Sequence, residues 1–167
     1  MSDHRVYARH CGVADGDRLS IPLIKRCVKA ALSLEGVDLP CEVSVLITDD
    51  PGISGINSEY RGVDEPTDVL SFPMQEFSSP GWSNPAVAVD PETELVPLGE
   101  IILSAERVIA QAREFGQPRE KETAYLTIHS VLHLLGYDHV DEAGMKKQMR
   151  GREKQIMQFL RGTGGVI

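Results

Sequence analysis

The stretch that decides the fold is residues 124–139, which read AYLTIHSVLHLLGYDH. From residue 124 to residue 135 it is apolar on nearly every helical face, a pattern typical of a helix buried at the centre of a domain. The strongly polar exceptions are His129 and His133. Gly136 is expected to end the helix, because glycine adopts positive φ at no steric cost, and the chain then turns toward His139.

Three histidines in this stretch follow the spacing H-x3-H-x5-H. His129 and His133 are four residues apart, so their imidazoles project from one helical face toward a common point. The short turn after Gly136 suffices to bring His139 to the same point. Three neutral imidazoles with an open fourth position describe a catalytic zinc site. The alternative is three hydrogen-bonded core histidines, which this spacing and the cost of burying them unpaired disfavour.

The metzincin peptidases share this spacing, since their pattern H-E-x-x-H-x-x-G-x-x-H matches the three histidines and Gly136. Ser130 stands where those enzymes carry a glutamate as general base, and a serine hydroxyl cannot take that proton near neutral pH. A peptidase of that mechanism is therefore disfavoured. Asp138 has two interpretations of equal weight, an acceptor that orients an imidazole N–H or a turn residue at the helix end.

Secondary structure is predicted on both sides of this stretch from apolar periodicity and from capping and turn residues. Strands are expected at residues 6–8, 42–48, 68–72 and 99–103, and helices at 21–34, between Asp50 and Gly62, from Ser104 to Gly116, from Pro118 to 135, and at about 141–160. The helix after Ser104 is expected to turn Phe115 to the same side as its apolar residues. Residues 76–97, with four prolines, predict a long surface loop and a candidate lid.

Length and composition point to one folded domain. The chain has 167 residues, a size at which one sizeable core forms without disulfides, and shows no internal repeat or domain boundary, so residues 1–167 are predicted to form a single domain. No apolar run approaches the length of a membrane span, and the N-terminus lacks the pattern of a signal peptide, which predicts a cytoplasmic protein. Cys11, Cys27 and Cys41 fit neither a disulfide framework nor paired metal spacing, so reduced and mostly buried thiols are expected.

The net charge of −8 argues against a uniformly positive nucleic-acid surface, but the distribution is uneven. Residues 30–106 carry fifteen acids and one base, Arg61, whereas residues 107–167 carry ten bases and seven acids. From spacing alone, a local ion pair of Arg61 with Asp64 or Asp68 is favoured over a bidentate contact with phosphate.

At this point the residues resemble a known family, the YbeY endoribonucleases or rRNA maturation factors. The family signature H-G-x-L-H-L-x-G-Y-D-H is similar to residues 129–139. A second segment, from Asn57 through Arg61 to Pro73, and a third at residues 98–101, similar to the family's L-G-D-I strand, extend the resemblance over about 53–160. Two departures are Ser130, which replaces the usual glycine, and the longer loop at 76–97. Neither removes a ligand.

The resemblance implies an α+β fold, with a small mixed β-sheet flanked by helices, and one zinc ion per chain held by His129, His133 and His139. It implies a metal-dependent hydrolase that cleaves single-stranded RNA in ribosomal RNA maturation, including 3′-end processing, and in ribosome quality control. The implied partners are single-stranded RNA, ribosomal RNA and the small ribosomal subunit, with ribosomal proteins or assembly GTPases as further candidates and no membrane. It also ties Arg61 to activity, so a contact of Arg61 with phosphate is now favoured over the local ion pair.

The mechanistic hypothesis is that zinc contacts a scissile phosphate oxygen or activates a water, while Arg61 neutralises charge in the transition state. Two rivals are a non-catalytic ribosome-assembly factor with a zinc site, against which the open ligand position argues, and a zinc hydrolase of a small molecule or peptide. Basic residues outside the acidic middle could line the approach of RNA or simply form a solvated helix face. They are Arg119, Lys121, Lys146, Lys147, Arg150 and Arg152.

Overall fold

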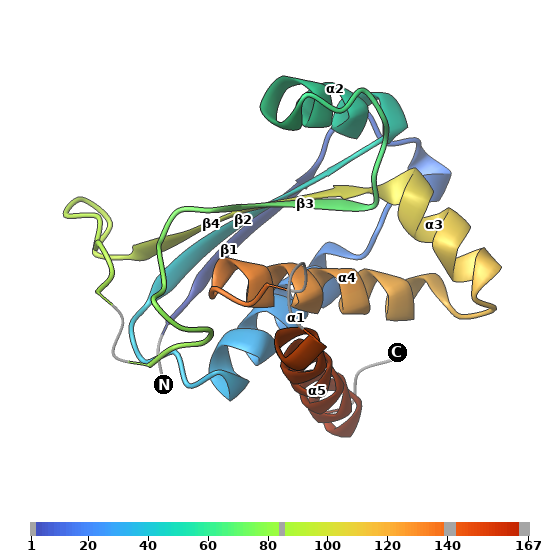
Figure 1. The fold of residues 1–167 in the computed structure, drawn as a ribbon. Helices are drawn as coiled ribbons and strands as arrows, with labels where there is room; N and C mark the ends of the chain where they lie inside the picture. The colour runs from blue at the N-terminus through green and yellow to red at the C-terminus, as the bar shows by residue number, and fades with distance from the viewer. Residues whose placement is uncertain (1–2, 84–85, 139–142, 164–167) are drawn as a thin grey trace.

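The computed structural model describes residues 3–83, 86–138 and 143–163 (Figure 1). Its described strands are β1 (Arg5–His10), β2 (Cys41–Thr48), β3 (Val69–Pro73) and β4 (Val96–Ser104). The described helices are α1 (Ile21–Leu34), α2 (Asp50–Arg61), α3 (Ala105–Glu114), α4 (Arg119–Leu134) and α5 (Ala143–Gly162), with a short 3-10 turn at Asp15–Asp17. This is the mixed α+β fold that the resemblance implied.

The sheet is small and mixed, with the strand order β1-β2-β4-β3. β1, β2 and β4 run parallel, whereas β3 pairs antiparallel with β4. Figure 1 shows α1 and α4 under one face of the sheet, α2 over the other face near one end, and α5 beneath α1 and α4. α4 contacts α1, α3, α5, β3 and β4, which places it at the centre of the fold, as its apolar sequence predicted.

Three sequence expectations differ from the structure. β1 extends to both sides of the predicted 6–8, and β4 begins at Val96 rather than residue 99, which shortens the predicted loop. Phe115 was expected on the apolar side of α3, but this is wrong, because α3 ends at Glu114 and the Phe115 side chain is 63% exposed. The expected start of the last helix at residue 141 lies outside the described residues.

Gly99 allows α4 to pack closely under β3 and β4. Its φ is +148°, and a Cβ atom there would lie 2.3 Å from the carbonyl oxygen of Phe72 and 2.8 Å from Cδ2 of Leu134. We therefore expect Gly99→Ala to lower the free energy of unfolding by about 3 kcal/mol, because backbone as well as side chain must move. Urea denaturation measures this. Gly55→Ala in α2, where a Cβ meets nothing within 4 Å, is the control, and equal stability of both variants contradicts the packing argument.

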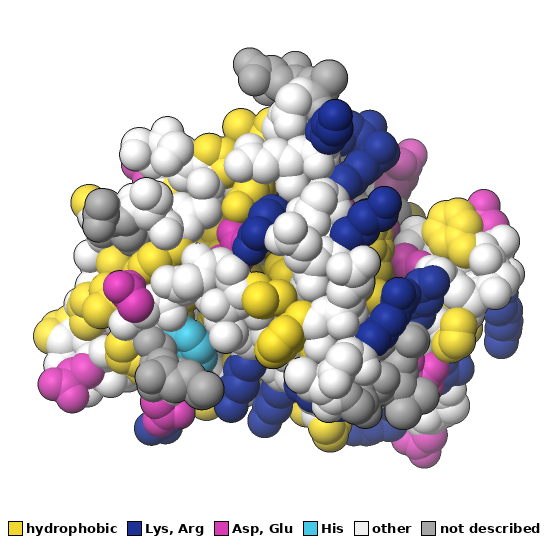
Figure 2. Space-filling view, turned by 90° about the horizontal axis from the view of Figure 1, so that it is seen from below, with side chains coloured by type: hydrophobic (Ala, Val, Ile, Leu, Met, Phe, Trp, Pro, Cys, Tyr) yellow, Lys and Arg dark blue, Asp and Glu magenta, His cyan; other side chains and the backbone are white. Residues whose placement is uncertain are grey.

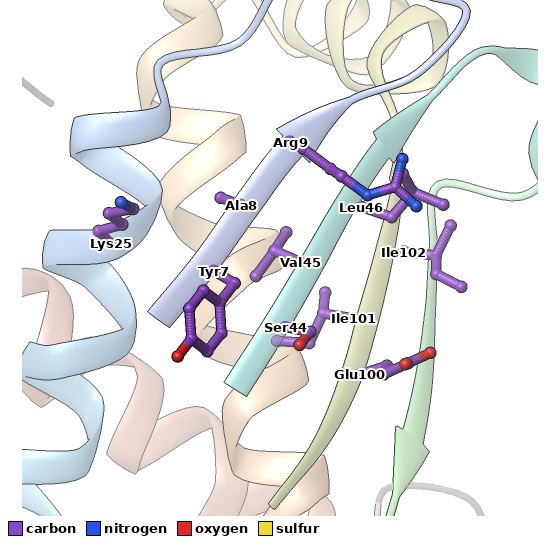
Figure 3. Close-up of a pocket in the computed structure, with 10 residues that line it drawn as sticks. All are labelled: Tyr7, Ala8, Arg9, Lys25, Ser44, Val45, Leu46, Glu100, Ile101 and Ile102. Carbon is purple, nitrogen blue, oxygen red and sulfur yellow. The ribbon is translucent and has the colours of Figure 1, made fainter. Parts of the chain in front are cut away.

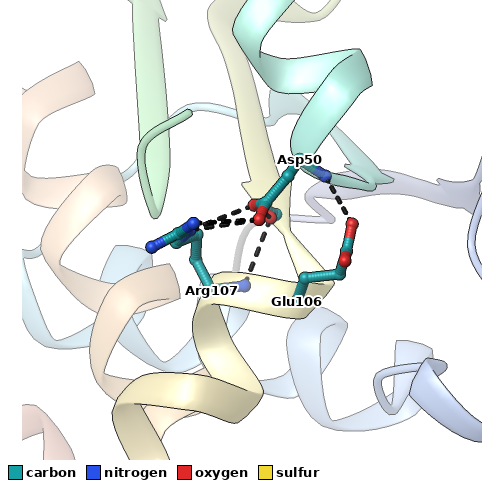
Figure 4. A network of polar contacts seen from close by, with 4 residues as sticks. Asp50, Glu106 and Arg107 are labelled. Atoms are coloured by element: carbon teal, nitrogen blue, oxygen red, sulfur yellow. Dashed lines mark hydrogen bonds and ion pairs between the residues drawn. The ribbon is translucent and has the colours of Figure 1, made fainter. Parts of the chain in front are cut away.

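α2 is fixed at its first turn, and this determines where Arg61 lies at its other end. Nε and Nη2 of Arg107 donate to the Asp50 carboxylate at 3.2 and 3.1 Å, the Ser104 hydroxyl donates to it at 2.8 Å, and the Asp50 backbone N–H donates to Glu106 at 2.7 Å (Figure 4). These contacts join α2 to the start of α3. At the C-terminal end, Gly62 adopts a φ of 70° and ends the helix directly after Arg61.

The described part of the chain contains no helix that is both long and apolar enough to span a membrane. Cys27 and Cys41 are buried free thiols, and burial raises the pKa of each to about 12, so both stay protonated. Cys11 is also free but exposed.

Figure 3 shows a hollow over β1, β2 and β4. Among the described residues that line this hollow, Glu100 is the one carboxylate and there is no histidine or cysteine, so they offer no ligand set for a transition metal.

Candidate active site

Two histidines meet on the face of α4 that borders a surface groove. The Nε2 atoms of His129 and His133 lie 3.1 Å apart, and the two rings are edge to face with centroids 4.7 Å apart. Both side chains are partly exposed, although most of α4 is buried. One helical turn therefore brings two ring nitrogens to a common point at the protein surface.

Glu153 of α5 contacts the imidazole of His129 at Nδ1, the ring nitrogen that does not approach His133. Its Oε2 lies 2.6 Å from Nδ1 of His129, and its side chain is only 6% exposed. An ionised carboxylate only accepts hydrogen bonds, so in the neutral imidazole of His129 the proton is on Nδ1 and Nε2 presents its lone pair toward His133. Tyr125 stacks on the same imidazole, with centroids 5.9 Å apart. Burial, and secondly the charge of Glu153, raise the pKa of Tyr125, so its hydroxyl stays protonated.

The groove beside the histidines has a volume of about 710 Å³ and follows β3. Its wall includes Arg61 at the end of α2, residues 67–73, Tyr125, His129 and His133 on α4, and residues 136–138 after it. Arg61 is exposed, and among the described residues it forms no ion pair. The ion pair with Asp64 or Asp68 that the spacing favoured is therefore absent. Asp68 instead accepts hydrogen bonds from its neighbours Thr67 and Val69.

The turn after α4 is anchored by a buried network. Gly136 has a φ of 94°, and the Tyr137 N–H donates to the carbonyl of Leu132 at 3.0 Å. The Tyr137 hydroxyl donates to Glu35 at 2.7 Å, and Nε of Arg152 donates to the other carboxylate oxygen of Glu35 at 2.6 Å. Burial, followed by Glu35, raises the pKa of Tyr137. The turn that precedes residue 139 is thus fixed to α1 and α5.

Part of the long loop packs against this turn. The Gly81 N–H donates to the carbonyl of Leu135 at 2.9 Å, and a Cβ on Gly136 would lie 2.8 Å from Cβ of Phe77. The indole N–H of Trp82 donates to Asp38 at 2.7 Å. Residues 77–82 therefore support the end of α4, and this part of the loop is not the free lid that its composition suggested.

The remaining candidates are placed as follows. His139 lies outside the described residues, and the described residues hold no group of three or more potential metal ligands. Asp138 is exposed and lines the groove. Ser130 is fully buried in the core, and its hydroxyl is not among the groups that line the groove.

Comparisons with known proteins identify the family. The family model described as Endoribonuclease YbeY matches residues 17–161. The chain is 46% identical over 138 residues to Endoribonuclease YbeY of Roseiflexus sp. (strain RS-1), covering 83% of this chain and 82% of the relative. It is 43% identical to that of Roseiflexus castenholzii, covering 94% and 91%. The chain belongs to the YbeY endoribonuclease family. Proteins of that name are hydrolases that act on RNA.

A solved structure supports the same fold. The solution structure of TM1509 from Thermotoga maritima matches this YbeY family member with a TM-score of 0.56 and 28% identity over 93% of each chain. Two residues that contact His129 were missed by sequence reasoning. Glu153 lies twenty-four positions beyond His129 on a different helix, and Tyr125 appears in the sequence as one apolar residue of α4 among many. No local spacing marks either one.

Proposed function

We propose that residues 1–167 form a single domain that acts as a zinc-dependent endoribonuclease specific for single-stranded RNA. Its proposed role is ribosomal RNA maturation, including 3′-end processing and ribosome quality control on the small ribosomal subunit in the cytoplasm. The observation that carries the proposal is the convergence of His129 and His133 on a groove that Arg61 also lines, in a member of the YbeY family.

The donor set fits zinc. Two imidazole nitrogens bound to tetrahedral zinc, at 2.0–2.1 Å each, are separated by about 3.3 Å, and the two Nε2 atoms here lie 3.1 Å apart. A carboxylate on the other nitrogen of a ligating histidine is the usual arrangement in zinc proteins, and Glu153 supplies it. His139 is proposed as the third ligand. Zinc held by these imidazoles would supply Lewis-acid chemistry to a phosphate oxygen or a water.

The protein's own groups have separate tasks in this proposal. Glu153 keeps the proton of His129 on Nδ1 and the ring in place. Arg61, which has no carboxylate partner among the described residues, contacts the scissile phosphate and offsets the negative charge that develops in the transition state. The groove along β3 holds the RNA strand in position for the metal and for Arg61.

Cleavage assays on matched substrates test this function. We expect metal-loaded protein to cut a single-stranded RNA and to leave the same sequence uncut when it is annealed to its complement. A chelator should abolish cutting, and zinc added back should restore it. Cleavage that survives removal of the metal contradicts the zinc requirement. Hydrolysis of ester or amide panels without any RNA cleavage favours the small-substrate hydrolase instead.

Glu153→Gln is expected to weaken zinc affinity by about 10-fold to 100-fold, because the amide removes the charge that raises the basicity of His129. Competition with a chromophoric chelator measures the affinity without reference to activity. Glu122→Gln is the control, since Glu122 is equally buried on α4 but is bonded to Gln111 and Gln117. Equal zinc affinity in the Glu153 variant and in the unmodified protein would show that Glu153 has only a structural role.

A further inference from the structure

A second groove lies between α4 and α5, next to the candidate active site. It has a volume of about 730 Å³, and four cationic side chains line it: Lys121, Arg150, Lys154 and Arg161. Figure 2, seen from below, shows Lys and Arg side chains in a row along one side of α5, with hydrophobic side chains nearby. The acidic protein therefore concentrates positive charge at one hollow.

The described residues offer these cations no partner that would neutralise them. Among the described residues, none of the four forms an ion pair with a carboxylate. Two other bases considered from the sequence are committed elsewhere, since Arg152 bonds Glu35 and Arg119 donates to backbone carbonyls of residues 16 and 18.

The carboxylates in the groove wall do not cancel the positive charge. Glu122 and Glu153 are both buried, and their oxygens are held by Gln111 and Gln117 in one case and by His129 in the other. Burial also raises the pKa of Glu122 and so disfavours its charged form. The solvent-facing charge of this groove is therefore positive.

Aromatic side chains connect the two grooves. Tyr125 lines both of them, with its ring stacked on His129 and 39% of its surface exposed. Phe115, which was expected on the apolar side of α3, also lines the second groove and is 63% exposed. Exposed rings among unpaired cations are the combination that binds single-stranded nucleic acid, through base stacking and phosphate contact.

We propose that the groove between α4 and α5 binds the part of a single-stranded RNA that continues beyond the cleavage point. Its phosphates contact Lys121, Arg150 and Lys154, and its bases stack on Tyr125 and Phe115. This inference rests on the proposed function for the identity of the strand. It adds that affinity depends on RNA length, because a strand too short to leave the first groove cannot reach the second.

The test compares two double variants. Each removes two positive charges, one variant in the groove and the other on α1. Arg150→Ala with Lys154→Ala is expected to raise the Kd for a labelled 2′-O-methyl RNA of about 20 nucleotides by about 10-fold or more, and to lower the salt slope of log Kd by about 1.4. Lys25→Ala with Arg26→Ala, on exposed positions of α1, is the matched control and should change Kd little. For a strand of about 4 nucleotides, both pairs should leave Kd unchanged.

Phe115→Ala tests stacking separately from charge. It is expected to raise the Kd of the long strand by about 5-fold to 20-fold, whereas Phe159→Ala, an exposed phenylalanine of α5 outside the groove, should not. Unchanged Kd in both groove variants, or an equal rise in the α1 control, overturns the proposal. Because each titration ends with a gel that shows whether the labelled RNA is intact, these outcomes are independent of cleavage. Absence of cutting by the unmodified protein would count against the proposed function alone.

Discussion

Replacing His133 with alanine is expected to remove the bound metal and to lower the single-turnover rate of RNA cleavage by about 10³-fold or more. The reason is geometric. The Nε2 atoms of His129 and His133 lie 3.1 Å apart, so they form one binding point, and loss of either leaves too few ligands to retain zinc. Elemental analysis after dialysis and a single-turnover assay on the same sample measure both effects.

His10→Gln is a suitable control for this experiment. His10 lies on β1, where its Nε2 accepts the Leu19 N–H, and it has no place in the groove. The control should keep its metal and its activity. A His133→Ala protein that is folded, retains one zinc per chain and cuts RNA at the normal rate would show that the histidine pair is not the metal site.

Replacing Arg61 with alanine is expected to lower kcat by about 10²-fold to 10³-fold while the zinc content stays normal, because the guanidinium acts on charge in the transition state. Arg61→Lys should recover only part of the rate, since an ammonium group cannot make the bidentate contact. Single-turnover kinetics at saturating protein isolates this step.

Arg113→Ala provides the comparison, as Arg113 also lies in the last turn of a helix and is exposed but does not line the groove. It should leave kcat unchanged. If Arg61→Ala cuts RNA as fast as the unmodified protein, Arg61 has no catalytic role and only solvates the end of α2.

The helices were predictable where local signals define both ends. α1 begins and ends at the residues expected, because the Ser20 hydroxyl caps its first turn and Gly36 follows its last. The bounds of α2 were equally predictable, because Asp49 caps its start and Gly62 ends it. β1 and β4 were predicted too short, because strand length depends on pairing with residues far along the chain, such as Arg5 with Glu42 and Val96 with Cys41.

The candidate site was predictable in the part that lies on one helix. The spacing of four residues determines that His129 and His133 share a face, whatever the rest of the chain does. Glu153 could not be predicted, because its contact depends on how α5 packs against α4. The same limit applies to Phe115, whose exposure follows from where α3 ends, and to Ser130, which helix rotation places in the core.

The most direct test of the central claim is the single-turnover cleavage of one labelled single-stranded RNA by three preparations from the same purification. These are the unmodified protein, His133→Ala and Arg61→Ala, each with its zinc content measured. The account predicts that the unmodified protein cuts, that neither variant does so at a comparable rate, and that Arg61→Ala alone of the two variants keeps its zinc. Equal cutting by all three would assign the activity to a contaminant and contradict the account, leaving the non-catalytic assembly factor as the better interpretation.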